Sequence, residues 1–520
     1  MQNKLLNFQS AKIKYLKLER DSWQKLLAIL IGLATTLWFI IRVIPKPIRI
    51  TYPCQRSAFP VLTGFIVWLS GVHLPIVTMK IKKNIIISVY KTLMITGVFS
   101  IAIFIIYGFS SNNLFSNMPA PSSKVWVPKD SANSPIGVGK GIFPGRVVWV
   151  RDTTATPYDG ITGHWWDDNS TKQDVVDTMI SKCICNLSGT TDDKKAWDKI
   201  FSFYNTTHNR GNKGYQPGEM IAIKINCNNA YEGYIDSDNQ IDASKQTVLG
   251  LIRQLVNNAG VPQDKIIFYE AIRVIPDRIY KPCHQEFPGV LWMDSKGNND
   301  NGRLPVVWRE NTIKYSGVTK CGTSIPQKVY EAVYLINMSL MKGHISMGIS
   351  LTAKNHYGSI NAQDHPWYNP GVYHPFVDLI GSKDLGGKTI LYIMDGLYGI
   401  RDVNDNVGKE FAAWNNLFKG QWLSSIFMSQ DPVAIDAVGY DFLRSEFGER
   451  LGRSSGAPAD TYMHEAALAN NPPSGTVYKP DGVRLSSLGV HEHWNNPVKK
   501  QYSRNLSPNG KGIELVQIHK

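Results

Sequence analysis

The sequence predicts an α/β fold in which helices flank a mostly parallel sheet in a Rossmann-like layering, preceded by a transmembrane helical region. Two observations lead to this prediction. Beyond Gly145, short runs rich in valine and isoleucine alternate with segments of helical periodicity, which is the pattern of a parallel sheet covered by helices. Before residue 110, the chain instead contains long apolar runs without charge. Its 520 residues are enough for roughly two or three domains.

Three apolar runs in the N-terminal region are candidate membrane spans. They cover residues 26–41, 57–79 and 92–109 and contain no Asp, Glu, Lys or Arg; a helix needs about 20 mostly apolar residues to cross a bilayer. A cleaved signal peptide is the alternative for the first run, but the segment RVIPKPIRITYPCQR that follows has no small-residue cleavage site. The second run, between Pro60 and Pro75, is either a span or a re-entrant segment. We therefore expect two or three helices within residues 26–109, after a basic cytoplasmic tail of residues 1–25.

The positive charge of the chain is concentrated in this same region. The first 110 residues contain 14 lysines and arginines but only two acidic residues, Glu19 and Asp21, so they account for +12 of the formal net charge of +14. The rest of the chain is nearly neutral, which argues against a nucleic-acid surface on the main body. With three spans, the N-terminal tail and the second loop hold ten basic residues and the first loop holds four. The side with more basic residues faces the cytoplasm, which predicts an inner (cytoplasmic) membrane protein with an extracytoplasmic main domain. If the second run does not span, this orientation inverts.

The composition of residues 110–145 predicts a linker, because they are rich in Ser, Asn, Pro and Gly. The main α/β domain is expected to comprise residues 146–520. Within it, the expected strands are RVVWV, MIAIKIN, KIIFYEA, VYLINMSL, TILYIMD and SSIFMS, and the expected helices are QDVVDTMISKCICNL, SKQTVLGLIRQLVNNAG, FVDLIGSK and DPVAIDAVGYDFLRSEFG. For the last helix, Asp431 is the expected N-cap, Pro432 the first helical residue and Gly448 the end.

Polar residues at the ends of these strands are candidates for a functional site. In open α/β sheets, ligands bind beyond the carboxyl ends of the strands. The residues at or just after the expected strand ends are Lys224, Asn226, Lys342, His344, Asp395 and Asp431, and Lys354 and Asn355 follow within one or two helical turns. If the strands are neighbours, these side chains converge on one crevice. Taken singly, each of these residues is explained equally well by a structural role and by a functional one.

Several segments resemble one protein family. In order along the chain, IAIKIN, LINMSLMKGHISMGISLTAKNHYGSI, LYIMDGLYGI and SQDPVAIDAVG resemble the core of the bacterial domain of unknown function 362 family, over roughly residues 145–447. The segments TYPCQRSAFP and GIFPGRVVWVRD resemble a membrane-anchored subgroup, and residues 448–520 form a C-terminal extension. The resemblance implies no established reaction, but some family members are joined to ferredoxin modules. This chain has no Cys-x-x-Cys run, so we expect no intrinsic iron–sulfur cluster.

The charges of the candidate site suggest an anionic ligand, phosphorylated or carboxylated. Gly348 and Ser350 precede a segment expected to begin a helix, whose free amide groups favour an anion. The candidate ligand-binding residues are Lys224, Asn226, Lys342 and Asn355, and the candidate catalytic residues are His344, Lys354 and Asp395. The candidate ligands of a divalent metal are Asp395, Asp431 and Asp436. The alternative for these carboxylates is a structural Lys–Asp network in which Asp431 only caps its helix.

Two classes of function remain open from the sequence. The first is an envelope enzyme that acts on a small anionic substrate with metal assistance. The second is a non-catalytic binding or redox-partner module, as the ferredoxin-linked relatives suggest. The expected partners are the lipid bilayer, a small anionic ligand and a redox or envelope protein, and no nucleic acid is expected.

The cysteines and one histidine pair are further candidates. The six cysteines are Cys54, Cys183, Cys185, Cys227, Cys283 and Cys321. Core thiols are the expected state, and a zinc site that includes Cys183 and Cys185 is the alternative. The pair His491 and His493 is expected to place both imidazoles on one face of a strand, which an exposed edge explains equally well.

Overall fold

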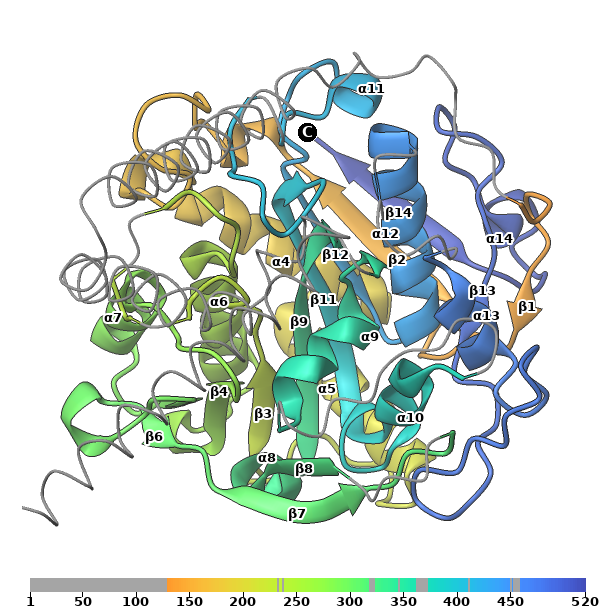
Figure 1. Ribbon diagram of the computed structural model, residues 1–520, viewed down its shortest axis with the longest axis horizontal. Helices are drawn as coiled ribbons and strands as arrows, with labels where there is room; N and C mark the ends of the chain where they lie inside the picture. The colour runs from red at the N-terminus through yellow and green to blue at the C-terminus, as the bar shows by residue number, and fades with distance from the viewer. Residues whose placement is uncertain are drawn as a thin grey trace, which may run out of the picture. The chain divides into compact units, whose positions relative to one another are not determined.

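The structure is a computed structural model (Figure 1). It describes residues 129–520, except for residues 232, 236–237, 318–322, 345–346, 362–372, 410–411, 449–450 and 452–458. The described residues belong to one compact unit, Pro121–Lys520. The three apolar runs predicted as membrane spans lie outside them. Within the described part, no helix has the length and apolar character needed to cross a bilayer.

A ten-stranded sheet forms the centre of the domain, and it is mostly parallel as predicted (Figure 1). β12 runs antiparallel to both of its neighbours, and the short β10 pairs antiparallel with β9; all other neighbouring pairs are parallel. In spatial order the strands are β14 (Glu514–His519), β2 (Arg146–Arg151), β12 (Ser425–Ser429), β11 (Thr389–Ile400), β9 (Tyr334–His344), β3 (Ile221–Lys224), β4 (Ile266–Glu270), β5 (Leu291–Asp294) and β6 (Leu304–Pro305), with β10 (Gly348–Ile349) beside β9.

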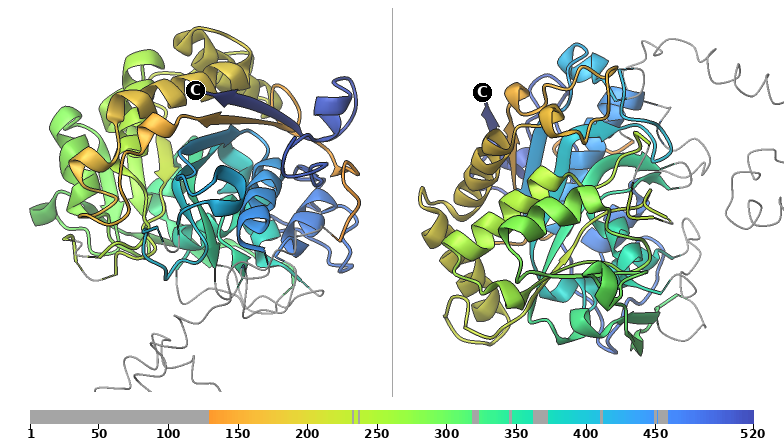
Figure 2. Two further views of the ribbon diagram at one scale, coloured as in Figure 1. Left: turned by 90° about the horizontal axis from the view of Figure 1, so that it is seen from above. Right: turned by 90° about the vertical axis from the view of Figure 1, so that its left-hand side faces the viewer.

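Helices cover both faces of this sheet, so the domain has three layers (Figure 2). One face packs against α4 (Gln173–Ser188), α5 (Asp193–Thr207), α6 (Lys245–Arg253) and α7 (Asp277–Glu286). The other packs against α8 (Gln327–Glu331), α9 (Thr352–Asn355), α10 (Pro375–Gly381), α12 (Pro432–Phe447) and α13 (Thr461–Ala467). In β2, Val148 and Val150 belong to the first core and Val147 and Trp149 to the second, because successive side chains of a strand point to opposite faces.

The predicted elements are present in the structure. The six expected strands are β2, β3, β4, β9, β11 and β12, and the four expected helices are α4, α6, α10 and α12. The capping of α12 is confirmed: the carboxylate of Asp431 accepts hydrogen bonds from the backbone N–H groups of Val433 and Ala434, Pro432 is the first helical residue and Gly448 ends the helix. Strands β9 and β11 continue further than expected, so that Lys342, His344 and Asp395 lie within strands.

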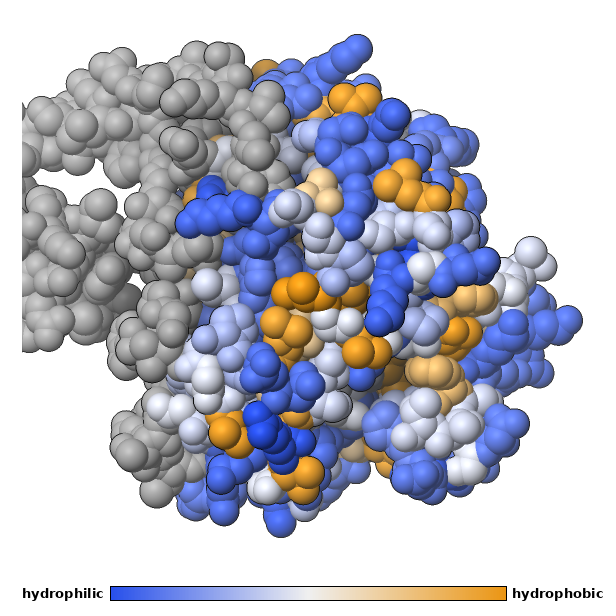
Figure 3. All heavy atoms as spheres, turned by 90° about the vertical axis from the view of Figure 1, so that its right-hand side faces the viewer, coloured by the Kyte–Doolittle hydropathy of each residue, from blue (hydrophilic) through white to orange (hydrophobic). Residues whose placement is uncertain are grey.

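Two small sheets and two short helices complete the domain. β1 (Ile136–Gly137) pairs with β13 (Val490–His491), and β7 (Trp308–Ile313) pairs with β8 (Thr323–Pro326). The short helices are α11 (Asn415–Phe418) and α14 (Ser503–Leu506). The surface on the side of β1 and α14 is mostly hydrophilic, with separate apolar patches (Figure 3).

Both ends of the described chain are integrated into the fold. The backbone N–H of Lys140 donates to the carboxylate of Asp431, and β1 lies within the segment predicted to be linker, so the ordered domain begins before residue 146. At the other end, β14 adds a parallel strand beside β2, so the C-terminal extension contributes to the central sheet.

The four described cysteines are Cys183, Cys185, Cys227 and Cys283, all of them buried free thiols. Burial raises the pKa of each of these thiols, which is the behaviour of inert core residues. Cys54 and Cys321 lie outside the described residues.

Candidate functional site

The sheet brings the carboxyl ends of β3, β4 and β9 together. β3 lies between β4 and β9 and is parallel to both, with Lys224 opposite Tyr269 on one side and Asn337 on the other. The residues that follow β3 and those at the end of β9 therefore meet at one edge. The described residues that meet there are Lys224, Asn226, Glu270, Asn337, Lys342, His344, Lys354 and Asn355.

Lys224 is a buried cation that is paired within the protein. Its ammonium Nζ lies 2.7 Å from Oε2 of Glu270 and 3.3 Å from Oδ1 of Asn355, and it also donates to the carbonyl of Ile225. The same Oε2 atom accepts a hydrogen bond of 3.3 Å from the N–H of Cys227. Oε1 of Glu270 is buried and has no hydrogen-bond partner among the described residues. Lys224 therefore supports the site as a structural cation.

Three asparagines connect the strands to α9. Nδ2 of Asn226 donates to Oδ1 of Asn355 at 2.9 Å, and Nδ2 of Asn355 donates to Oδ1 of Asn337 at 2.8 Å and to the carbonyl of Met338 at 3.0 Å. Oδ1 of Asn226 accepts a hydrogen bond of 2.8 Å from Nζ of Lys342. Buried amide groups are costly to leave unpaired, so this network fixes the position of α9 relative to the strand ends.

Lys342 is buried, and its pKa is lowered. Burial is the main cause of a shift to about 8, which Lys224 reinforces and which Asp242 and Glu270 oppose. Its hydrogen bond to Asn226 is to a neutral acceptor. Lys342 therefore contributes positive charge to the site, and no carboxylate of the described residues pairs directly with its ammonium group.

Lys354 is a partly buried lysine whose ammonium group has no hydrogen-bond acceptor in the described part of the chain. Among the residues that the structure describes, its ammonium group has one direct contact, the ring of Tyr357, whose centroid lies 5.8 Å from Nζ. Burial, together with the positive charges of Lys342, Arg273 and Lys224, lowers its pKa to about 7. An ammonium group in this setting is stabilised by an anion, and the described residues place none at its Nζ.

The two histidines of the region differ in their surroundings. Burial, together with the positive charges of Lys354 and Lys342, lowers the pKa of His344 well below its usual value, so its imidazole is neutral at neutral pH. His356 is buried, and its Nε2 accepts a hydrogen bond of 3.1 Å from Nδ2 of Asn337. Burial lowers the pKa of His356 to about 3, as expected for a structural imidazole.

The aspartates predicted as metal ligands have other roles. Asp395 accepts hydrogen bonds from the backbone N–H and the hydroxyl of Ser244, the N-cap residue of α6. Asp431 caps α12 and also accepts from the N–H groups of Lys140 and Val490. In both cases the carboxylate oxygens are occupied by N–H and O–H donors.

Asp436 has a similar role at the start of α9. One of its oxygens accepts from the N–H and hydroxyl of Thr352, at 2.8 and 2.6 Å, and the other from the N–H of Ala353, at 3.0 Å, and the hydroxyl of Tyr462, at 2.7 Å. Thr352 and Ala353 begin the segment whose free amide groups were predicted to favour an anionic ligand. The carboxylate of Asp436 occupies them instead, so the predicted anion site at the helix N-terminus is wrong.

The structure thus does not bring Asp395, Asp431 and Asp436 together as metal ligands. Among the described residues, the one group of metal-ligating side chains whose ligand atoms gather within 4.8 Å of one another lies elsewhere and contains none of the three. The physical reason is that all three are buried, and buried carboxylates are stabilised by nearby N–H and O–H donors. Asp395 is also removed from the candidate catalytic set, because Ser244 and the N–H of Leu397 satisfy its oxygens.

Gly358 explains part of the sequence motif that follows Lys354 and Asn355. A Cβ atom at Gly358 would lie 2.5 Å from Oε1 of Glu270 and 2.5 Å from Nζ of Lys224. Its carbonyl accepts a hydrogen bond of 3.0 Å from the N–H of Ala271. The spacing Lys-Asn-x-x-Gly therefore places the backbone directly against the buried ion pair.

Two members of the site were missed in the sequence. Glu270 ends β4, so the strand-end rule that selected Lys224 also applies to it. Asn337 lies in the middle of β9, within an apolar run. A buried amide in such a run is the local signal of a hydrogen-bonded network, but the sequence does not specify its partners.

A comparison with known families supports the resemblance drawn from the sequence motifs. The model of the family described as Domain of unknown function (DUF362) matches residues 306–441. This span contains Lys342, His344, Lys354 and Asn355, whereas Lys224 and Glu270 lie before it. No curated protein matches the chain.

Proposed function

We propose that this chain binds a small anionic ligand, phosphorylated or carboxylated, at the carboxyl ends of β3 and β9. The observation that carries the proposal is the environment of Lys354, a partly buried ammonium group whose charged neighbours Lys342, Arg273 and Lys224 are all positive. Removing a cation from water is unfavourable unless an opposite charge compensates it. A bound anion supplies that charge.

The balance of charge around the site favours the same ligand. Glu270 is paired with Lys224, so it does not neutralise the other cations directly. Arg273 donates to the backbone carbonyls of Asn228 and Ile272 and packs over Tyr231, and none of these groups is acidic. Asp242, whose charge opposes the lowering of the pKa of Lys342, is itself paired with Arg278. Lys342, Lys354 and Arg273 therefore leave the site positively charged, and a small dianion matches this arrangement.

Lys354 also has the properties of an acid–base group. With a pKa of about 7, its amine is present in both protonation states near neutral pH. His344 is neutral there, and the charges of Lys354 and Lys342 act on its imidazole. These two residues are the catalytic candidates that remain of the three predicted. Lys354 is therefore the first candidate for the acid–base group of a reaction at this site.

The membrane anchor forms part of the same proposal. In this proposal the apolar runs within residues 26–109 anchor the chain in the inner membrane, as in the membrane-anchored subgroup of the family, and the basic-residue distribution favours a main domain outside the cytoplasm. A reporter enzyme that is active only outside the cytoplasm, fused after Lys520, should be active. A silent reporter at Lys520 would mean that the orientation is inverted.

The decisive experiment compares Lys354→Met with the parent chain. Sulfate, phosphate and citrate are titrated into the full chain while its melting temperature and the heat of binding are followed. The parent is expected to bind at least one of them, and Lys354→Met to bind it about 10- to 100-fold more weakly, as expected for the loss of one charge-assisted hydrogen bond. In anion-free buffer the variant should melt at the parent's temperature or higher, because a costly buried charge has been removed.

The control variant is Lys182→Met, which removes a partly buried lysine of α4. It should bind the anion like the parent. A large loss of stability of Lys354→Met in anion-free buffer would show a structural lysine and contradict the proposal, as would equal anion affinity in all three proteins.

A further inference from the structure

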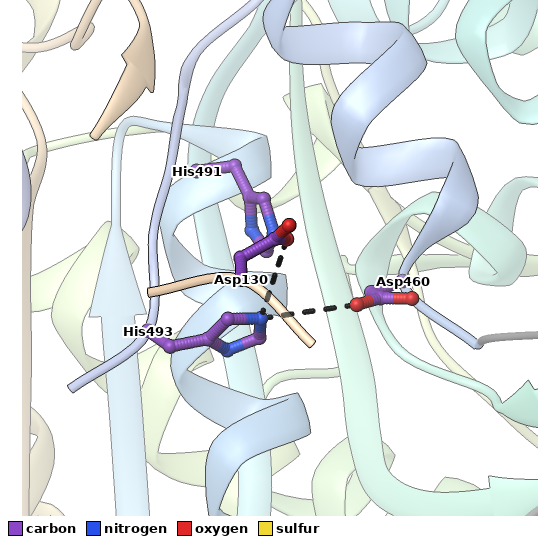
Figure 4. A group of neighbouring side chains, drawn as sticks. All are labelled: Asp130, Asp460, His491 and His493. Atoms are coloured by element: carbon purple, nitrogen blue, oxygen red, sulfur yellow. Dashed lines mark ion pairs between the residues drawn. The ribbon is translucent and has the colours of Figure 1, made fainter. Parts of the chain in front are cut away.

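A second cluster of polar side chains lies far from the strand-end residues in the sequence. Asp130, Asp460, His491 and His493 each offer one atom to a common centre, and these atoms lie within 4.8 Å of one another (Figure 4). They come from three separate parts of the chain: the N-terminal segment of the domain, the residue before α13, and β13 with the residues that follow it. The fold has to be complete before they meet.

His493 is oriented by a buried carboxylate. Its Nδ1 atom lies 2.7 Å from Oδ1 of Asp441, which itself accepts from the N–H of Trp494 at 3.0 Å and the hydroxyl of Tyr502 at 2.9 Å. Nε2 of His493 points toward the cluster, 3.8 Å from Oδ2 of Asp460 and 4.0 Å from Oδ2 of Asp130 (Figure 4). A histidine held through one nitrogen by a carboxylate, with the other directed at a centre, is the usual arrangement of a metal-binding imidazole.

His491 provides an independent sign of a ligand. Its side chain is only 1% exposed, yet neither ring nitrogen has a hydrogen-bond partner among the described residues. Its neighbours are aromatic rings, with the centroids of His464 and His493 at 4.5 and 5.0 Å. Burying an imidazole without any polar partner is unfavourable, so the position is explained by a group that binds one of the nitrogens.

The two aspartates are also directed at this centre. Asp460 occupies the N-cap position of α13, but its side chain makes no capping hydrogen bond and faces His493 instead. Oδ2 of Asp130 lies 2.6 Å from Nε2 of His464, a contact that orients the carboxylate. An aspartate at an N-cap position commonly accepts hydrogen bonds from the first amide groups of its helix. The carboxylate of Asp460 does not, and it lies in the cluster.

We propose that Asp130, Asp460, His491 and His493 bind one divalent transition-metal ion, with Zn²⁺ as the best match. Two imidazole nitrogens and two carboxylate oxygens are a donor set that Zn²⁺ accepts in tetrahedral geometry. Bonds of about 2.0–2.2 Å require ligand atoms about 3.4 Å apart. The four ligand atoms lie within 4.8 Å of one another, so binding of the ion draws them closer together.

The site is of the structural kind, since the protein supplies all four ligands and leaves no open position for a substrate. An ion there connects the N-terminal segment at Asp130 with the start of α13 and with β13. Asp130 is 48% exposed, which gives the ion a path from solvent. The ion would therefore stabilise the attachment of the segment that leads into the domain.

The test is metal binding by the full chain. The chain is purified without chelator, its zinc content is measured by elemental analysis, and Co²⁺ and Zn²⁺ are titrated into metal-free protein. We expect one ion per chain, a visible Co²⁺ spectrum of tetrahedral type and a higher melting temperature with Zn²⁺. Asp130→Asn and His491→Gln should each bind at least about tenfold more weakly.

Asp130→Asn changes a half-exposed side chain, so it tests the site even if His491→Gln fails to fold. The matched control is His284→Gln, which removes another imidazole with a buried nitrogen lacking a partner, in α7. It should bind the ion like the parent. Absence of binding by the parent, or equal affinity in the parent and Asp130→Asn, would overturn the proposal.

Discussion

Lys224 and Glu270 form a buried ion pair across two adjacent parallel strands, with 2.7 Å between Nζ and Oε2 and side chains that are 0% and 3% exposed. The pairing of β3 with β4 places the two residues at neighbouring strand ends. The ion pair is thus a consequence of the sheet topology, and Asn355 and Gly358 pack directly on it. The remaining cations of the candidate site lie around this ion pair.

The first prediction concerns this ion pair. Lys224→Met leaves the carboxylate of Glu270 buried without its cation, and breaking a buried pair from one side costs about 3–5 kcal/mol of stability. We expect a loss of that size in the free energy of unfolding measured with denaturant. The double variant Lys224→Met/Glu270→Gln should recover part of it, because no unpaired charge remains. A single variant as stable as the parent would contradict a structural role for Lys224.

The second prediction concerns Gly358. An alanine Cβ would lie 2.5 Å from Nζ of Lys224 and from Oε1 of Glu270, so one of the two side chains has to move. Gly358→Ala should therefore cost about 1–3 kcal/mol, as expected for overpacking of a buried site. Gly408→Ala is the control, because the nearest atom to its added Cβ is the carbonyl oxygen of Gly160 at 3.5 Å. Equal stability of the two variants would show that the ion pair rearranges freely.

The third prediction concerns pH. Sulfate keeps its charge from about pH 6 to pH 9, whereas Lys354 and Lys342, with pKa values of about 7 and 8, lose their protons over this range. Sulfate binding should therefore weaken as the pH rises. Calorimetric titrations at several pH values measure this effect, and in Lys354→Met the part of the dependence centred near pH 7 should disappear. Binding that is constant over this range would contradict a role for these ammonium groups.

The stability of the sulfate-free protein should change in the opposite direction. The pKa of Lys354 is lowered in the folded chain, so between about 7 and its ordinary value near 10.5 the unfolded chain binds more protons. The contribution of Lys354 to stability therefore rises with pH in this window. Lys354→Met should flatten that rise in a series of denaturant titrations.

The fourth prediction separates the two roles considered for Asp436. Its carboxylate accepts hydrogen bonds from Thr352, Ala353 and Tyr462, so Asp436→Ala leaves these donors without their acceptor and should cost about 2–4 kcal/mol of stability. It should also weaken anion binding, because α9 carries Lys354. Metal content should not change. Loss of a bound ion in Asp436→Ala, with stability retained, would restore the metal role.

Much of the fold was predictable because its signals are local. The apolar runs of β2, β3, β4, β9, β11 and β12 and the caps of α12 are determined by periodicity and by the residues at each end. The association of Lys224, Asn226 and Lys342 was predicted from their positions at strand ends, on the condition that the strands are neighbours, and Asn355 was expected to follow within one or two helical turns. The edge strand β14 and the pairing of β1 with β13 have only short sequence signals.

The sequence by itself determined the layered α/β architecture and which cations gather at the carboxyl ends of the strands, because both depend on repeating patterns along the chain. Apart from Asp431, whose capping of α12 was predicted from the sequence, only the tertiary structure decided the roles of the acidic residues. Glu270 became the partner of Lys224, Asp436 took the amide groups of α9, and Asp441 oriented His493 toward Asp130 and Asp460. A carboxylate can accept from a backbone amide, pair with a cation or bind a metal, and which donor lies within about 3 Å is set by the packing of segments that are distant in sequence.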